Sequence, residues 1–139
     1  SNFGKGTYLL FEVWKNTNMS KEVIKMKIKE IIDALKLELV TNLDDKTLDK
    51  YIENAYTCDL LSNVLSKAKE DNAWITLQTN VNVVGVAVIK KIPIIIITEG
   101  NTVPEETIKK ANENSIIIAR TNSPSFELSG KLYSLLNGE

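Results

Sequence analysis

Apolar residues three or four positions apart predict amphipathic helices along most of the chain. In the first of them, Ile24, Ile28 and Ile31 share one face. The segment 81–89 is apolar almost all round and ends in two lysines, which favours a buried helix over a strand. The predicted helices cover residues 22–36, 60–68, 81–89, 104–111 and 123–136.

Strands are predicted where apolar residues alternate with polar ones or run without interruption. Residues 37–40 alternate, whereas 94–98 and 115–119 are nearly continuous β-branched runs, typical of strands covered on both faces. The segment 42–50 is polar and is expected to be a loop. The remaining predicted strands are residues 51–58 and 73–78.

From residue 51 onward, strands and helices alternate four times. This order predicts a parallel sheet with right-handed crossovers, to which the first helix and strand add at one edge. We therefore expect an α/β fold, a three-layer sandwich around a mostly parallel sheet of about five strands. The domain is expected to span residues 26–139, with 1–25 as an N-terminal extension that is part tag or upstream sequence.

The composition changes this picture mainly by exclusion. The 139 residues contain no histidine and one cysteine, which exclude a histidine-assisted nucleophile, an ordinary zinc site and an intrachain disulfide. The net charge of -1 argues against nucleic-acid binding, and no apolar run approaches the length of a membrane span. We expect a cytoplasmic protein that is not an enzyme and has no cofactor.

A ligand site is expected where the predicted parallel strands end, because open α/β sheets bind ligands at that edge. Hydroxyl and amide side chains gather there, and helix N-termini facing the same edge would offer N–H donors to a phosphate. No glycine-rich phosphate-binding motif is present. The candidate ligand-binding residues are Asp59, Gln78, Thr79, Asn80, Asn82, Thr98, Glu99, Gly100 and Arg120.

Several of these residues also have a purely structural interpretation. Asp59 is expected to be the N-cap of the helix that follows it, and Asn80 either caps a helix or holds a left-handed turn. Gly100 fits a turn with positive φ. Arg120 could bind a phosphate or carboxylate through two hydrogen bonds, or simply pair with Glu99. The lone thiol, Cys58, is expected to be buried and inert.

Four segments of this sequence, in this order and spacing, resemble the small stand-alone DRTGG-domain proteins of bacteria. The segments are 56–65, 74–79, 82–87 and 94–100, which 104–108 continues, and the resemblance extends over about residues 26–136. It implies a fold like the N-terminal domain of HPr kinase/phosphorylase. Related regulatory domains in CBS-containing pyrophosphatases bind adenine nucleotides or diadenosine polyphosphates, and none of these domains is the catalytic part.

Two departures from the family pattern affect the expected site. Thr79-Asn80-Val81-Asn82 stands where the family has its Asp-Arg pair, and both charges are missing. The Thr-Gly-Gly turn appears as Thr98-Glu99-Gly100, which places a carboxylate where a phosphate would lie.

Two functions remain open after these observations. The first is a non-catalytic regulatory domain that binds a small ligand, such as an adenine nucleotide or another phosphate-bearing molecule. The second is a protein-protein interaction or homodimerisation module without a small ligand. The resemblance also implies a protein partner in redox or hydrogenase-linked regulation, and a homodimer is expected in either case.

Overall fold

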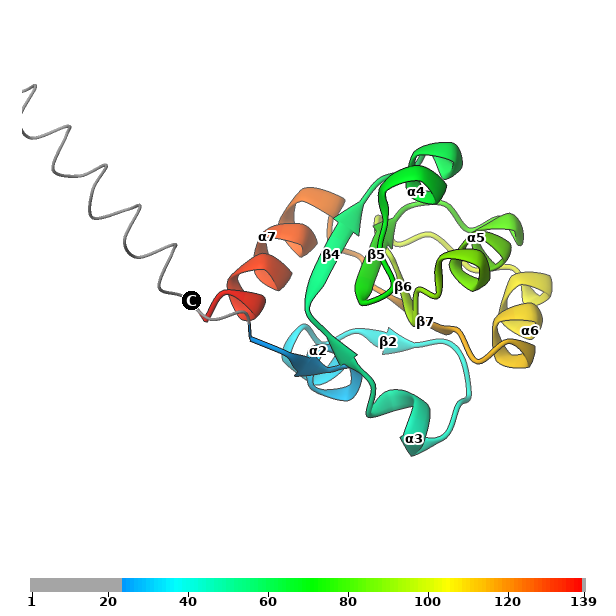
Figure 1. The fold of residues 1–139 in the computed structure, drawn as a ribbon. Helices are drawn as coiled ribbons and strands as arrows, with labels where there is room; N and C mark the ends of the chain where they lie inside the picture. Colours follow the sequence, from blue (N-terminus) through cyan, green and yellow to red (C-terminus); the bar gives the residue numbers. More distant parts are fainter. Residues whose placement is uncertain (1–23, 139) are drawn as a thin grey trace, which may run out of the picture.

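The computed structural model describes residues 24–138, which fold around a five-stranded sheet with the order β2-β7-β6-β5-β4 (Figure 1). The sheet comprises β2 (Glu38–Leu39), β4 (Asn54–Thr57), β5 (Asn72–Thr76), β6 (Ile94–Ile97) and β7 (Ile117–Arg120). A separate antiparallel pair joins β1 (Met26–Lys27) to β3 (Tyr51–Ile52). The helices are α2 (Ile28–Ala34), α3 (Asp45–Leu48), α4 (Leu61–Lys67), α5 (Asn82–Lys90), α6 (Glu105–Glu113) and α7 (Ser125–Leu136).

Strands β4 to β7 are parallel neighbours in chain order, as the alternation of helices and strands predicts. Ile75 of β5 lies opposite Ile96 of β6, which lies opposite Ala119 of β7. Every step to the next strand goes in the same direction, so the right-handed connections through α4, α5 and α6 cover one face. β2 pairs antiparallel with β7 at the far edge.

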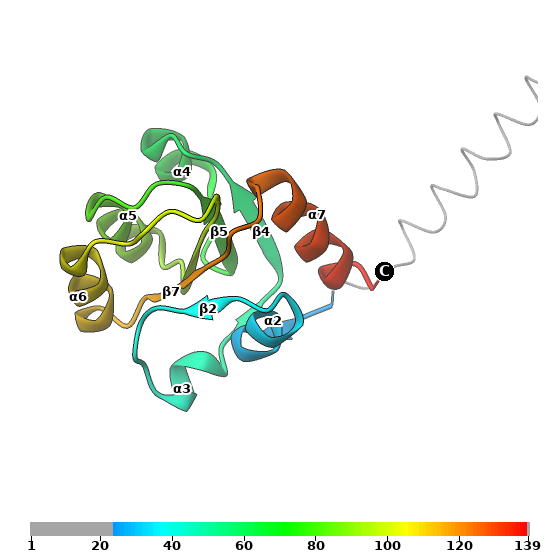
Figure 2. The ribbon, with the colours of Figure 1, turned by 180° about the vertical axis from the view of Figure 1, so that it is seen from behind.

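The sheet separates two apolar cores, because side chains alternate between its faces. On one side, Trp74, Ile95 and Ile118 pack beneath α4, α5 and α6. On the other side, Ile96 and Ile117 pack beneath α2 and α7. All five side chains are completely buried. Figures 1 and 2 show the three layers from opposite sides, and the expected sandwich is confirmed.

The prediction of one helix over 22–36 is wrong at its start. Met26 pairs with Ile52 in the small sheet, and the Lys27 backbone is extended. The Glu30 carboxylate accepts a hydrogen bond from the Lys27 N–H at 2.9 Å, which satisfies one of the N–H groups at the start of α2. The helix therefore begins at Ile28. The predicted extension over 1–25 lies outside the described residues except for its last two positions.

Two further predictions between residues 42 and 58 need correction. The polar segment expected to be a loop contains α3, whose N-cap Asp44 accepts hydrogen bonds from the Thr47 N–H and hydroxyl at 2.9 and 2.8 Å. The strand predicted over 51–58 is divided into β3 and β4, which belong to different sheets.

The start of α6 is held by a contact from outside its own first turn. The N-cap of α6 is Pro104, and no side chain caps it by a hydrogen bond. The Thr107 hydroxyl donates instead to the carbonyl oxygen of Thr79, in the loop before α5. That bond ties the start of α6 to the neighbouring loop at the carboxyl edge of the sheet.

Candidate functional site

The carboxyl ends of β4 to β7 lie along one edge of the sheet, and the nine predicted ligand-binding residues lie in the loops that leave them, except Arg120 at the end of β7 and Asn82 at the start of α5. The structure divides these residues into two groups. One group surrounds Asp59 and Gln78, after β4 and β5, and the other surrounds Glu99 and Arg120, after β6 and β7. Since β5 lies between β4 and β6, Asp59 and Glu99 follow strands that are not adjacent.

Asp59 is not the N-cap of α4, so that expectation is wrong. The N-cap is Leu60, without a side-chain hydrogen bond. The Asp59 carboxylate accepts hydrogen bonds from the Thr76 hydroxyl at 2.8 Å and the Leu77 N–H at 2.9 Å. The Gln78 amide donates to the Asp59 carbonyl oxygen at 3.3 Å. Asp59 thus fastens the loop after β4 to the end of β5, where backbone donors would otherwise be unpaired.

The residues before α5 form a turn that is held by Asn80. Its side-chain oxygen accepts a hydrogen bond from the Asn82 N–H at 2.9 Å. The N-cap of α5 is Val81, and Asn80 does not have positive φ, so both expected roles of Asn80, as helix cap and in a left-handed turn, are wrong. Thr79 contributes its carbonyl oxygen to Thr107. The side chain of Asn101 reaches the Leu77 carbonyl oxygen, so this turn is also linked to the loop after β6.

The loop after β6 is fixed against the start of α7. Glu99 has the left-handed backbone with φ 66°, and its carboxylate accepts a hydrogen bond from the Ser125 N–H at 3.1 Å. Thr98 is completely buried, with its hydroxyl 2.6 Å from that of Ser125. Gly100 has φ 71°, which confirms the expected turn. The carboxylate of Glu99 therefore occupies the positive end of α7.

Arg120 lies at the end of β7, and its guanidinium contacts both the loop after β6 and strand β2. One terminal nitrogen donates to the Gly100 carbonyl oxygen at 2.8 Å, and the other lies 3.4 Å from the Glu38 carboxylate. The Nε–H is buried without a partner among the described residues. The expected pairing with Glu99 is therefore wrong, because that carboxylate is engaged at α7.

The loops after β6 and β7 diverge to opposite faces of the sheet. The first leads to α6 on one face and the second to α7 on the other, whereas the loops after β4 and β5 lead to the same face as α6. Two backbone hydrogen bonds, from Glu99 N–H to Ser123 O and from Gly100 N–H to Thr121 O, join the diverging loops. This is a topological switch point of the kind at which α/β sheets bind ligands.

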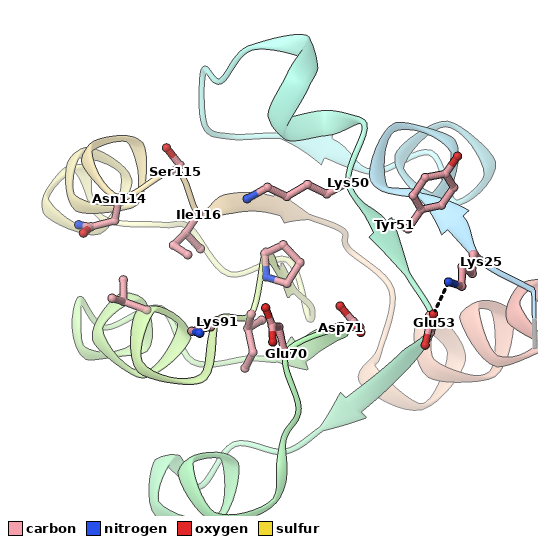
Figure 3. Close-up of a pocket in the computed structure, with 13 residues that line it drawn as sticks. Lys25, Lys50, Tyr51, Glu53, Glu70, Asp71, Lys91, Asn114, Ser115 and Ile116 are labelled. Carbon is pink, nitrogen blue, oxygen red and sulfur yellow. Dashed lines mark ion pairs between the residues drawn. The ribbon is translucent and has the colours of Figure 1, made fainter.

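A hollow of about 590 Å³ lies at the opposite, amino edge of the sheet (Figure 3). The residues directly before the four parallel strands all line it, namely Glu53, Asp71, Pro93 and Ile116. Its walls also include Lys25, Lys50, Tyr51, Glu70, Val88, Lys91, Ile92, Asn114 and Ser115. None of the nine residues predicted from the sequence lies in this hollow.

Charged side chains of both signs face the hollow. Lys25 and Glu53 form an ion pair of 2.9 Å, drawn as a dashed line in Figure 3. The hydrogen bond to Glu53 raises the pKa of Lys25 above its ordinary value, with a smaller contribution from the charge of Asp71. Lys25 is thus paired with Glu53 and lies near the charge of Asp71.

Sequence reasoning missed the hollow because its residues resemble ordinary solvent-exposed charges between elements. The rule that ligands bind at carboxyl strand ends also directs attention to the other edge. One usable signal was present: an acidic residue or proline comes directly before three of the four parallel strands, at Glu53, Asp71 and Pro93.

Among residues 24–138, no three histidine, cysteine, aspartate or glutamate side chains are close enough together to hold a metal ion. Cys58 is partly buried, and its sulfur lies 3.7 Å from the Leu60 carbonyl oxygen. Within the same range, no helix has the length and apolar character required to cross a bilayer.

Comparison with known proteins identifies the family. The sequence profile described as HPr Serine kinase N terminus matches residues 64–136, which is more than half of the chain. This chain belongs to that family. The resemblance to DRTGG domains and to the N-terminal domain of HPr kinase is thereby confirmed. A search of curated protein sequences finds no match.

The fold is also similar to a solved structure from Clostridium perfringens. That structure contains the CBS and DRTGG domains of the regulatory region of a pyrophosphatase, in complex with its activator diadenosine tetraphosphate. The TM-score is 0.65 at 19% sequence identity, and the match covers 80% of this chain and 47% of the other. This DRTGG-type domain thus spans about half the length of its structural neighbour.

Proposed function

We propose that this chain is a non-catalytic regulatory domain that binds a small phosphate-bearing ligand, such as an adenine nucleotide, at the switch point between β6 and β7. The observation that carries the proposal is the junction of Arg120, Gly100 and Glu99 with the start of α7. Among the nine predicted residues, this group combines a cation, a helix N-terminus and diverging loops. The activator of the similar pyrophosphatase region is a diadenosine polyphosphate, which has the same chemistry.

A phosphate would bind here by exchange. It would take the N–H groups of α7 from the Glu99 carboxylate and the Arg120 guanidinium from Glu38. Both of these carboxylates are attached to loops or edge strands, so their release would change the position of β2 and of the loop after β6. Because α7 packs across β4, a displacement of α7 would be transmitted to the edge of the sheet opposite β2. We assign these displacements to the domain as its regulatory response to the ligand.

The absence of catalysis rests on the same contacts. The polar side chains around Asp59, Thr98 and Arg120 donate to or accept from the protein's own backbone and side chains. Hydroxyl and amide groups used in this way hold hydrogen bonds but transfer protons poorly near neutral pH. The chain also has no histidine to act as a general base.

Thermal unfolding with ATP, AMP, diadenosine tetraphosphate and inorganic pyrophosphate tests the proposal. A ligand present at about 100 times its Kd should stabilise the domain by about 2.7 kcal/mol. No shift with any of the four would contradict ligand binding of this class.

Two variants with opposite expected effects locate the site. Arg120→Gln should weaken binding, because it removes the cation, whereas Glu99→Gln should tighten binding, because it removes a competing carboxylate from α7. Lys109→Gln, on the exposed face of α6, is the matched control for loss of one positive charge. If all three variants bind equally well, the ligand does not lie at this junction.

The second candidate function is an interaction or homodimerisation module, and the exposed apolar surface favours it. Leu60 is 62% exposed and Ile89, on α5, is 70% exposed. Strand β4 has no neighbour on its outer side among the described residues, and a hollow of about 310 Å³ lies between it and α7. Light scattering across a concentration series tests this function. A dimer that Ile89→Glu converts to monomers would support it, and a monomer at every concentration would contradict it.

A further inference from the structure

The geometry points to a second binding site, in the hollow at the amino edge of the sheet, for a free amino acid with an apolar side chain. This site is independent of the phosphate site proposed above and lies at the other end of the strands. Four chain segments that lead into β4, β5, β6 and β7 converge on it, so its walls are held by the central sheet (Figure 3). Its volume of about 590 Å³ is within the range of small-molecule pockets.

One side of the hollow suits an ammonium group. Glu70 and Asp71 line it, and neither forms an ion pair with another described residue. The C-terminal end of α6 also reaches the hollow, where Asn114 lines the wall. A helix C-terminus carries partial negative charge, which adds to the field of the two carboxylates.

The opposite charge for a carboxylate group comes from Lys50 and Lys91. Both line the hollow, and neither forms an ion pair within the described part of the chain. Lys91 has the left-handed backbone with φ 57° at the C-cap of α5, where the chain turns toward β6. An α-amino acid carries the two charges that these pairs of side chains would complement.

The floor of the hollow is apolar. Ile92 is completely buried, Ile116 is 6% exposed, and Pro93 lies between the charged walls. Val88 is 43% exposed at the end of α5, and the Tyr51 ring is half exposed on the β3 side. Because Ile92 and Ile116 already lie in the core, the apolar surface that a ligand would newly cover is that of Val88 and Tyr51, which favours an aliphatic or aromatic ligand over a polar one.

The balance of charge argues against a purely anionic or purely cationic ligand. Three lysines (Lys25, Lys50, Lys91) and three acidic residues (Glu53, Glu70, Asp71) line the hollow, so their formal charges sum to zero. A polyphosphate would meet three carboxylates and a polyamine three ammonium groups. A zwitterion meets favourable partners at both of its ends.

NMR titration of the ¹⁵N-labelled chain with L-leucine tests this proposal. We expect saturable shifts of the amide signals of Asp71, Ile92 and Ile116, whereas Thr98 and Gly100, at the phosphate site, stay unchanged. N-acetyl-L-leucine lacks the ammonium group and L-leucinamide lacks the carboxylate, so each should bind about tenfold more weakly or worse. No saturable shift with L-leucine, or equal binding of either analogue, would overturn the proposal.

Matched variants tie the binding to the charged walls. Asp71→Asn removes one acceptor of the ammonium group, and Lys91→Asn removes a cation while keeping a residue that tolerates the left-handed backbone. Each should weaken L-leucine binding about tenfold. Glu113→Gln and Lys109→Gln, which change the same charges on α6 outside the hollow, should bind normally. Urea unfolding confirms that each variant is folded, and unchanged binding by folded D71N and K91N would overturn the proposal.

Discussion

At the scale of single residues, polar side chains at the carboxyl edge mainly join one loop to the next. Asp59 connects the loop after β4 to β5, Thr98 contacts the start of α7, and Arg120 connects β7 to β2 and to Gly100. Each bond satisfies a backbone or side-chain group that a loop would otherwise leave unpaired. A ligand at this edge must therefore compete with bonds that already exist.

Substitution of Asp59 measures how much stability these loop-joining hydrogen bonds contribute. Asp59→Ala removes the acceptor of the Thr76 hydroxyl and the Leu77 N–H, and we expect a loss of about 1 kcal/mol in the free energy of unfolding, since water can reach part of this site. Asp59→Asn keeps an acceptor oxygen at the same position and should cost less. Urea unfolding of the two variants measures the difference. If both variants match the parent chain, these hydrogen bonds contribute no net stability.

Asp44 makes stability depend on pH in the acid range. Hydrogen bonds from the Thr47 N–H and hydroxyl hold the pKa of its carboxyl below the ordinary value of 3.8. A carboxyl whose pKa is lowered by folding adds stability above its unfolded pKa and loses that contribution as the pH falls through the folded pKa.

The comparison of Asp44→Asn with the parent chain isolates that contribution, because asparagine can accept similar hydrogen bonds but does not titrate. The parent should be the more stable at neutral pH, and its advantage should disappear as the pH falls below about 4. Chemical denaturation at a series of pH values measures this. A difference that stays constant from neutral to strongly acid pH would contradict the assignment.

At the scale of elements, several helices end in residues with the left-handed backbone that are not glycine. Lys36 after α2, Lys91 after α5 and Ser115 after α6 have φ of 53°, 57° and 57°. In each case an N–H near the turn bonds back to the helix, as from Leu37 to the Ile32 carbonyl. The bonds satisfy helix carbonyl groups, but the side chains at positive φ carry a steric cost.

Replacing Lys36 with glycine should remove that cost. We expect Lys36→Gly to raise the free energy of unfolding by about 0.5–1 kcal/mol, because glycine adopts positive φ without strain. Ala34→Gly, two residues earlier within α2, should lower it by a similar amount, because glycine weakens a right-handed helix. Thermal unfolding of both variants measures whether the free energy of unfolding changes in opposite directions. Destabilisation by both would show that the turn after α2 is not strained.

The predictability of the fold differs between long and short elements. The runs at Ile94–Ile97 and Ile117–Arg120 are strands buried by helices on both faces, so their composition alone identifies them. The small elements depend on contacts from elsewhere in the sequence. Met26 becomes a strand because Ile52 pairs with it, and α3 is a single turn set by Asp44. A periodicity rule needs more residues than such elements contain.

The candidate sites also differ in how much of them the sequence predicts. The carboxyl edge could be located from the order of strands and helices, but the partners of Asp59, Glu99 and Arg120 could not, because each depends on which strands are neighbours. The hollow at the amino edge is formed by residues far apart in the sequence, from Lys25 to Ile116. Spacing along the chain contains no direct signal of such convergence.

At the scale of the whole molecule, one sheet supports both cores, and neither core is complete without it. Neighbouring residues of β6 face opposite sides: Ile95 packs beneath α4, α5 and α6, and Ile96 packs beneath α2 and α7. Both side chains are completely buried. Losing either core would expose one whole face of the central strands, so the two cores should unfold together.

Cavity variants on the two faces test this coupling. Ile95→Ala and Ile96→Ala should each lower the free energy of unfolding by about 2–5 kcal/mol, through lost burial and the cavity that remains. Each variant should still unfold in a single transition, with circular dichroism and amide hydrogen exchange of α5 and α7 reporting the same loss. If Ile95→Ala weakens only α5, or Ile96→Ala only α7, the two layers are independent. In that case a ligand at the β6–β7 junction could not act across the sheet through shared packing, and the regulatory exchange at Arg120 and Glu99 would be confined to the loops it joins.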